Sequence, residues 1–397
     1  MTPAAPAAYD SSTALPFIIA ALVAAMALSF LLTPVAIRIA RRVGAIDEPD
    51  EGRRVHRQPV PRGGGLAVVT AFVGVGIAAF LINDQVNAIA VPNLPASLIQ
   101  PWQLAALFGG CLLAAGFGLL DDRYQLLARW QLLVQLGLAG IAVFAGIFIG
   151  GFSNSIDNPV PFLVSGDSFQ IGGVVAVVLS IVWIVGMINS VNFIDGLDGL
   201  STGVALIAVA TLAYLSFETG SKTPQPFVAL LCAVLAGALA GFLPWNFHPA
   251  KVFIGTTGVY AVGFALAVLS ILGAAKVAVA MLVLGVPIID TFWIIIRRLS
   301  AKQSPFTPDR GHFHHRLLDL GLTHRSAVLV IYAICAVLAV LSVVLSSTAS
   351  LYAFAGIVVG GGLVLQLMTR RSREALDARS YDSDAPSDEP LGEPPAT

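Results

Sequence analysis

The chain has 397 residues, of which 57% are hydrophobic and only 11% are charged. Soluble domains carry about 25% charged residues, so a water-soluble protein is excluded and lipid must cover much of the apolar surface. The formal net charge is −1, so the total charge says nothing about nucleic acid or acidic partners. We expect no nucleic-acid partner.

Eleven apolar stretches are long enough to cross a membrane, since a spanning helix needs about 20 mostly apolar residues. In chain order they cover residues 16–37, 63–82, 102–120, 130–150, 172–188, 200–217, 226–243, 255–272, 274–296, 326–346 and 351–368. The sequence therefore predicts an all-α fold, a polytopic membrane bundle of about eleven transmembrane helices.

The basic residues predict the orientation of this bundle. Of the 22 Lys and Arg, all but Lys222 and Lys276 fall on the side of the odd-numbered loops and the C-terminal tail. Positively charged loops stay in the cytoplasm, so we expect the N-terminus outside and the C-terminus inside. Residues 1–368 are predicted to form one transmembrane domain. The acid-, Pro- and Ser-rich residues 369–397 are predicted to be a disordered cytoplasmic tail.

Four polar segments lie where predicted helices meet the cytoplasmic surface. The first, residues 47–65, contains Arg57 and Arg62 among acids, prolines and glycines. Arg side chains of this kind recognise phosphate groups. A basic loop that fixes topology and touches anionic lipid would have the same composition, and both interpretations remain open.

The second segment is the acidic pair Asp121 and Asp122, which follows nineteen mostly apolar residues. Acids are disfavoured at the C-terminal end of a helix by its macrodipole, so capping does not explain them. Adjacent helical residues point about 100° apart, so one acid can face a metal ion while the other faces a substrate. We predict a catalytic or metal-binding role for the pair.

The third segment carries a polar residue at every third position: Asn189, Asn192, Asp195 and Asp198. Such a stripe winds slowly around one side of a helix. Gly196 and Gly199 indicate a break that lets the backbone approach a ligand. Amide and carboxylate oxygens suit Mg²⁺ and the hydroxyls of a nucleotide sugar.

The fourth segment contains His312, His314, His315 and Arg316. Three histidines within four residues are compatible with zinc. The neighbouring Arg310 and Arg316 would repel a cation and attract a diphosphate, so we favour anion recognition. Together the four segments suit phosphoryl transfer, in which a divalent cation and fixed charges neutralise phosphates.

These motifs, in this order, resemble the polyprenyl-phosphate N-acetylhexosamine-1-phosphate transferases, the family that starts O-antigen and teichoic-acid synthesis and includes the peptidoglycan lipid I translocase. The resemblance spans roughly residues 45–320 and includes the segment 286–291, similar to the family's helix with Pro and Asp. Residues 308–317, PDRGHFHHRL, look like the O-antigen and teichoic-acid branch.

The resemblance implies a reaction at the bacterial inner membrane. A cytoplasmic UDP-N-acetylhexosamine, by expectation UDP-N-acetylglucosamine, would donate sugar 1-phosphate to polyprenyl phosphate and release UMP, with Mg²⁺ or Mn²⁺ as cofactor. It assigns catalysis to Asp121, Asp122, Asp195 and Asp198, and metal binding to Asp121 and Asp122, and we expect Thr256 to be a further metal ligand. It assigns substrate binding to Asn189, Asn192, His312, His314, His315, Arg316, Arg57 and Arg62. A homodimer is compatible with it.

Two positions depart from the family pattern. Thr256 stands where the family has an Asp that resembles a metal ligand, and Gln131 stands where it has a Lys associated with phosphate binding. A Thr hydroxyl can still bind Mg²⁺, which often needs only one or two protein carboxylates. We therefore hypothesise an active transferase with altered metal affinity.

Two alternatives remain. A catalytically silent homologue would bind nucleotide sugar or lipid phosphate without turnover, and the same two departures motivate it. A secondary transporter would also have many helices with polar residues inside the membrane. Transporter sites lie near the bilayer midplane, whereas the ionisable groups of this sequence gather at one face.

Overall fold

The computed structural model describes residues 11–48, 59–89, 99–149, 171–217, 225–273, 277–300, 312–345, 349–350 and 352–361. Helices dominate these residues, as predicted. In chain order they are α1 (Ser11–Val43), α2 (Gly65–Val86), α3 (Pro101–Tyr124), α4 (Ala128–Phe144), α5 (Ile171–Phe193), α6 (Leu200–Phe217), α7 (Pro226–Asn246), α8 (Gly255–Leu272), α9 (Val277–Val283), α10 (Gly285–Ser300), α11 (Phe313–Asp319) and α12 (His324–Val344). A short apolar helix also covers Tyr352–Gly361.

Eight of the described helices are long and apolar enough to cross a membrane, or nine if the α9–α10 pair is one bent span. Two further predicted stretches contain shorter apolar helices, Ala128–Phe144 and Tyr352–Gly361. The multi-pass membrane fold is thus confirmed, while the exact number of eleven spans stays a prediction. The proposed tail, residues 369–397, lies outside the described residues.

The prediction of one continuous helix over residues 274–296 is wrong, because the structure has two helices there with a break between them. Val277–Val283 and Gly285–Ile294 meet at an angle of 76°. Pro287 has no N–H to donate to the carbonyl one turn earlier, and Gly285 adds backbone freedom at the junction. Such residues are the usual causes of sharp helix kinks.

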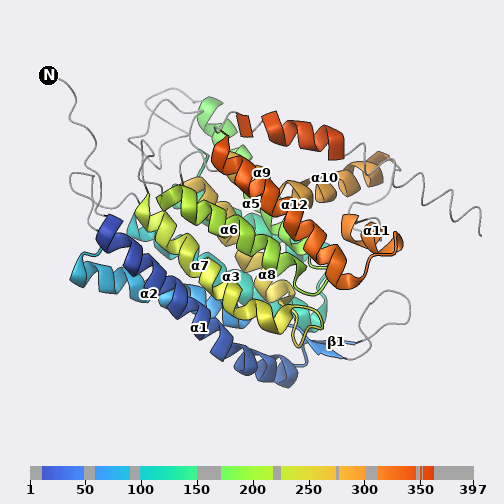
Figure 1. The fold of residues 1–397 in the computed structure, drawn as a ribbon, viewed down its shortest axis with the longest axis horizontal. Coiled ribbons are helices and arrows are strands. Elements are labelled where there is room, and N and C mark those ends of the chain that lie inside the picture. Colours follow the sequence, from blue (N-terminus) through green and yellow to red (C-terminus); the bar gives the residue numbers. More distant parts are fainter. Residues whose placement is uncertain are drawn as a thin grey trace, which may run out of the picture.

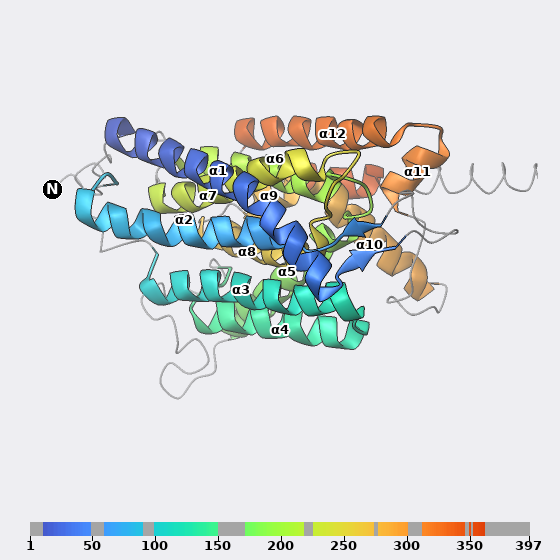
Figure 2. The ribbon, with the colours of Figure 1, turned by 90° about the horizontal axis from the view of Figure 1, so that it is seen from below.

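The centre of the bundle is formed by α7 and α8. In the most apolar stretch of α8, 89% of residues are buried, against 22% in α1. The α1 and α6 helices pack along α7, and α3 and α5 pack along α8, as Figures 1 and 2 show. Large apolar side chains such as Leu31 and Phe144 are exposed at the periphery, as expected for a lipid-facing surface.

Small elements outside the long helices gather at the end of the bundle away from the start of α1 (Figures 1 and 2). A two-stranded antiparallel ribbon pairs β1 (Ile46–Asp47) with β2 (Val60–Pro61). Phe253, just before α8, donates its N–H to Pro61 and accepts from Gly64. The ribbon is formed mostly by the first predicted polar segment, and α11 contains His314, His315 and Arg316 of the fourth.

Candidate active site

Asp121 and Asp122 lie in the last turn of α3, and both are buried. Asp122 Oδ1 accepts from the Thr256 N–H at 2.8 Å. Asp122 Oδ2 accepts from the Thr257 N–H at 3.0 Å and from the Thr257 hydroxyl at 2.6 Å. The first N–H groups of a helix lack internal partners and carry the positive end of its dipole. The start of α8 therefore stabilises an acid that its own helix end disfavours.

Two glycines allow α3 and α8 to approach this closely. A Cβ on Gly118 would lie 2.4 Å from the Thr257 Cα. Gly255 has a φ of +69°, and a Cβ there would lie 2.5 Å from Asp122 Oδ2. Glycine adopts this backbone conformation without the steric cost that other residues meet. The backbones themselves thus fix the position of the acidic pair.

The two departures from the family pattern meet at Asp121. The Thr256 hydroxyl donates to Asp121 Oδ2 at 2.7 Å, and the Gln131 side-chain amide donates to Asp121 Oδ1 at 2.9 Å. The Leu126 N–H adds a third hydrogen bond to Oδ1, at 3.0 Å. Asp121 is therefore held by three neutral donors.

Arg62 brings a positive charge to the acidic pair from the end of β2. Its Nη1 donates to Asp47 at 3.3 Å, and its Nε lies 3.7 Å from Asp122 Oδ1. That Nε is buried and has no hydrogen-bond partner in the described part of the chain. A buried unpaired donor costs free energy, so a phosphate oxygen would be a favourable ligand for it.

The acidic pair offers oxygen atoms that suit a hard cation such as Mg²⁺. Asp121 Oδ2 accepts only the Thr256 hydroxyl among the described residues, which leaves it further accepting capacity. The oxygens of Asp121 and Thr256 therefore fit the ion. Asp122 Oδ2 fits less well, because Thr257 already donates to it twice.

Asn189 and Asn192 lie near the end of α5. Asn189 donates to Gln135 at 2.7 Å and to the Val185 carbonyl at 2.8 Å, and Gln135 donates to the Tyr260 hydroxyl at 3.0 Å. Asn189 and Gln135 together thus join α4, α5 and α8. Asn192 is half-buried one turn later, closer to the predicted break.

Asp195 occupies the loop of residues 194–199, outside the helices. The Ser201 hydroxyl donates to its Oδ1 at 2.5 Å. Burial raises the pKa of Asp195 to about 7, and Asp122 and Asp198 add to this while Ser201 and Arg62 oppose it. This places a carboxyl that can exchange a proton at neutral pH near the acidic pair.

Asp198 is held by two histidines. Its Oδ2 lies 2.7 Å from His248 Nδ1 and accepts from the Ala250 N–H at 3.1 Å, while its own N–H donates to His324 Nε2 at 2.8 Å. The three side chains could bring metal-ligating atoms within 4.8 Å of one another. The two rings are stacked, with centroids 4.3 Å apart, so their nitrogens lie in separate near-parallel planes. Hydrogen bonding explains this arrangement better than a shared ion.

The histidine segment begins α11. His314 is buried, and a Cβ on Gly196 would lie 2.2 Å from its Nε2, so this ring packs on the 194–199 loop. Burial, with His315 and His312 nearby, holds the pKa of His314 well below its usual value. His314 is therefore neutral at pH 7 and can offer a hydrogen bond rather than a charge. Arg316 is also buried.

Some predicted residues cannot be placed. Arg57 and Arg310 lie outside the described residues. Among those that are described, no grouping of three metal-ligating side chains includes His312, His314 or His315.

Sequence reasoning did not select Gln135, His248 or His324 as site residues. Gln135 follows Gln131 by one helical turn, so helical periodicity could have found it. His248 and His324 are isolated in the sequence, and no local spacing points to them.

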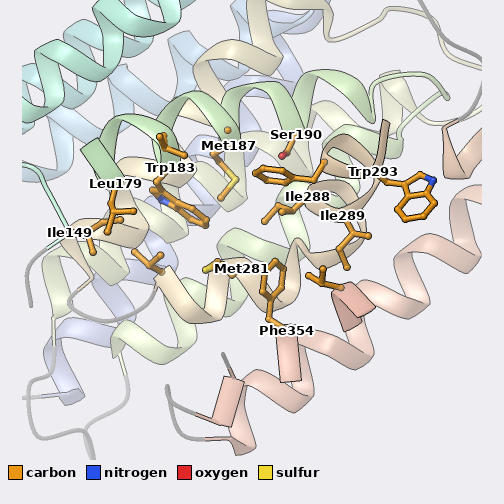
Figure 3. A pocket seen from close by; sticks show the side chains of 15 residues that line it. Ile149, Leu179, Trp183, Met187, Ser190, Met281, Ile288, Ile289, Trp293 and Phe354 are labelled. Atoms are coloured by element: carbon orange, nitrogen blue, oxygen red, sulfur yellow. The ribbon is translucent and has the colours of Figure 1, made fainter. Parts of the chain in front are cut away.

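An apolar cavity of about 470 Å³ opens beside α5. Figure 3 shows Trp183 and Met187 of α5 facing Met281 of α9, Ile288 of α10 and Phe354. Ser190 lines one part of the cavity and directly follows Asn189, so apolar and polar regions are adjacent on α5. The size is typical of a small-ligand site.

Comparison with known proteins gives consistent matches. The model of glycosyl transferase family 4 matches residues 104–274. The "Probable undecaprenyl-phosphate N-acetylglucosaminyl 1-phosphate transferase" of Bacillus subtilis is 37% identical over 336 residues, covering 83% of this chain and 85% of the relative. The "Decaprenyl-phosphate N-acetylglucosaminephosphotransferase" of Mycobacterium tuberculosis is 31% identical, covering 78% of both chains. The "Phospho-N-acetylmuramoyl-pentapeptide-transferase" of Staphylococcus aureus is 29% identical, covering 78% of this chain and 93% of the relative.

Proposed function

Because the chain belongs to glycosyl transferase family 4, we propose that it transfers N-acetylglucosamine 1-phosphate from UDP-N-acetylglucosamine to polyprenyl phosphate and releases UMP. The relatives' names support both the sugar phosphate and the polyprenyl acceptor. The observation that carries the proposal is the buried pair Asp121 and Asp122, held by the start of α8 beside Arg62, whose Nε lies 3.7 Å from Asp122 and has no hydrogen-bond partner among the described residues. The product, a polyprenyl-diphosphate sugar, would start the synthesis of a cell-envelope polysaccharide.

In this reaction an oxygen of the lipid phosphate bonds to the sugar-bearing phosphorus, and the bond from that phosphorus to the UMP oxygen breaks. Arg62 is positioned to hold a phosphate oxygen through its Nε. Asp195, with its pKa of about 7, accepts the proton that the lipid phosphate loses. Asp198 fixes the shape of the loop that carries Asp195, because His248 and His324 hold it.

The proposed metal ion is Mg²⁺ or Mn²⁺, held by Asp121 and Thr256, with Asp122 as the neighbouring charge. When bound, it would neutralise charge on the phosphates. The donor is proposed to contact Asn192, His312, His314, His315 and Arg316, with Arg57 contributing from outside the described residues. Both side-chain N–H groups of Asn189 are used by Gln135 and Val185, so we propose that it positions α5.

The acceptor lipid is proposed to lie in the apolar cavity beside α5. Its lining is almost entirely hydrocarbon and sulfur, which suits an isoprenoid chain. Ser190 (Figure 3) and the adjacent Asn189 would then mark where the isoprenoid chain ends and the phosphate begins.

The proposal includes the topology predicted from the basic residues. Eleven spans, an outside N-terminus, a cytoplasmic C-terminus and an active site at the cytoplasmic face of the bacterial inner membrane form one consistent arrangement. A cytoplasmic UDP-sugar requires that orientation. The gathering of α11, β1 and β2 at one end of the bundle supports it.

A silent homologue is the second candidate, because all donors on Asp121 are neutral and come from the protein. One acid and one base of the family pattern are replaced by Thr256 and Gln131, so the local charge is unchanged. We favour the active enzyme, since Asp121 keeps accepting capacity on Oδ2. A transporter is not supported, because the matched relatives quoted above are all named as transferases.

The test uses purified protein in detergent with polyprenyl phosphate and radiolabelled UDP-N-acetylglucosamine, with and without Mg²⁺ or Mn²⁺. Metal-dependent label in the lipid phase, lost in Asp121→Asn and kept in Asp319→Asn, would support the proposal. Asp319 is an exposed acid on α11 and serves as the matched control. Nucleotide binding without transfer would favour the silent homologue.

A further inference from the structure

Asp290, in the bent helix α10, holds the start of α11. It is only 2% exposed. Its Oδ2 lies 2.9 Å from His312 Nδ1, and its Oδ1 accepts from the Phe313 N–H at 2.9 Å. The side chain of His312, the residue before α11, makes no capping hydrogen bond. Asp290 therefore supplies the cap from a different helix.

The same contact determines which nitrogen of His312 carries the proton. A carboxylate only accepts hydrogen bonds, so Nδ1 is the donor and a neutral ring keeps its lone pair on Nε2. The ring also lies against Phe193, with centroids 5.9 Å apart, and stacks on His314 at 5.4 Å. His312 is thus fixed in both orientation and tautomer.

The helix that carries Asp290 also lines the apolar cavity. Ile288 and Ile289 precede Asp290, Phe292 and Trp293 follow it, and all four line the cavity. Figure 3 labels Ile288, Ile289 and Trp293. One face of α10 thus meets the proposed acceptor site, while its buried acid holds the proposed donor segment.

We propose that Asp290 is a positioning residue that ties the donor-binding histidine segment to the helix lining the acceptor cavity. It holds His312 with its proton on Nδ1 and its Nε2 available to the sugar nucleotide. The inference rests on the proposed function. We expect lipid that packs against α10 to stabilise the placement of Asp290 that holds His312, and so to tighten nucleotide binding. Linkage makes any such effect reciprocal between the two substrates.

The experiment compares Asp290→Asn with the matched control Asp319→Asn. In Asp290→Asn the side-chain carbonyl can still accept from Phe313, but the new amide group must donate to His312, which moves the ring proton to Nε2. The unfolding temperature should stay near that of the unaltered protein. The kcat/KM for UDP-N-acetylglucosamine should fall about 10- to 100-fold, as for other residues that orient a ligating or reacting histidine.

Two further measurements separate positioning from a merely structural role. The ¹⁵N NMR signals of His312 should show the change of tautomer in Asp290→Asn. Polyprenyl phosphate should tighten UDP-N-acetylglucosamine binding about fivefold or more in the unaltered protein and in Asp319→Asn, and should have no such effect in Asp290→Asn.

A kcat/KM for Asp290→Asn within about twofold of the Asp319→Asn value would overturn the inference, as would a loss without a change in tautomer or in the lipid effect. If Asp290→Asn does not fold, His312→Asn replaces it, because its amide can still donate to Asp290 while Nε2 is lost. Full activity of that variant would also overturn the inference. Absence of transfer in the unaltered protein would instead contradict the proposed function.

Discussion

The two halves of the candidate site are built in different ways. The acid half comprises Asp121, Asp122, Thr256 and Thr257, and backbone N–H groups and glycine contacts between α3 and α8 fix it. The histidine half comprises Asp290, His312, His314 and the 194–199 loop, and side-chain contacts from separate short elements hold it. In this site, the acidic charges are positioned by backbone contacts, whereas the proposed substrate-binding residues are positioned by side-chain contacts between separate elements.

The largest effect is expected for Asp122→Asn, which breaks the acid half. An amide would place N–H groups against N–H donors of α8, so at least one buried donor loses its acceptor. We expect the free energy of unfolding to fall by about 3 kcal/mol and the transfer rate to fall about 10³-fold. Thermal unfolding and the radiolabel assay would measure both changes. A stable variant would show that the start of α8 does not depend on this acid.

The next largest effect is expected for Asp195, which lies in the 194–199 loop of the histidine half. Its folded pKa of about 7 exceeds the ordinary pKa of 3.8, so its carboxylate forms only as the pH rises toward 7. Transfer should therefore fall as the pH drops below 7. Asp195→Asn should lose about 10²-fold in rate and lose this pH dependence.

The pH dependence of stability has the opposite sign to the pH dependence of the transfer rate. Because burial disfavours the charged form, the contribution of Asp195 to stability is present below pH 4 and is lost as the pH rises through 7. Asp195→Asn should remove that part of the pH dependence of unfolding. A pH–rate profile that is unchanged in the variant would contradict this assignment.

A smaller effect is expected where Thr256 and Gln131 share Asp121. Thr256→Asp alone adds a third carboxylate to the acid half and should destabilise it in the absence of metal. Gln131→Lys should compensate, with a coupling of about 1–3 kcal/mol in a double-mutant cycle. The metal concentration for half-maximal transfer should fall in the double variant. Additive effects would show that the two positions changed independently.

The smallest effect is expected at His248, which supports Asp198 in the histidine half. His248→Asn keeps an N–H donor near the position of Nδ1, whereas His248→Ala leaves Asp198 without it. We expect His248→Ala to lower kcat about tenfold and His248→Asn to lower it less. Equal losses in both variants would show that the ring stacked on His324 matters more than the hydrogen bond.

Much of this molecule follows from the order of its residues. Apolar length predicts the helices, and Asp121 with Asp122 is conspicuous because acids rarely end an apolar stretch. The sequence also singles out Thr256 and Gln131. It does not show that both side chains donate to the same carboxylate. Thr256 and Gln131 lie 135 and 10 positions from Asp121 in the sequence, and only the fold brings all three together.

The break between α9 and α10 and the partners of the histidine segment were harder to foresee. Pro287 marks the kink, but Pro is tolerated in many membrane helices, so the residue alone does not settle the angle. The contacts of Asp290 with His312 and of Asp198 with His248 depend on how helices pack. No local spacing contains that information.

The close contact of Gly118 with Thr257 limits how this enzyme can change over generations. Any side chain at Gly118 or Gly255 would push α8 away from Asp122, so substitutions there should destabilise the acid half whatever the substrate. Substitutions that keep this contact are expected only at the edge of the acid half. Thr256 and Gln131 are two such positions, and paired replacement there changes the chemistry of the site while the scaffold stays as it was.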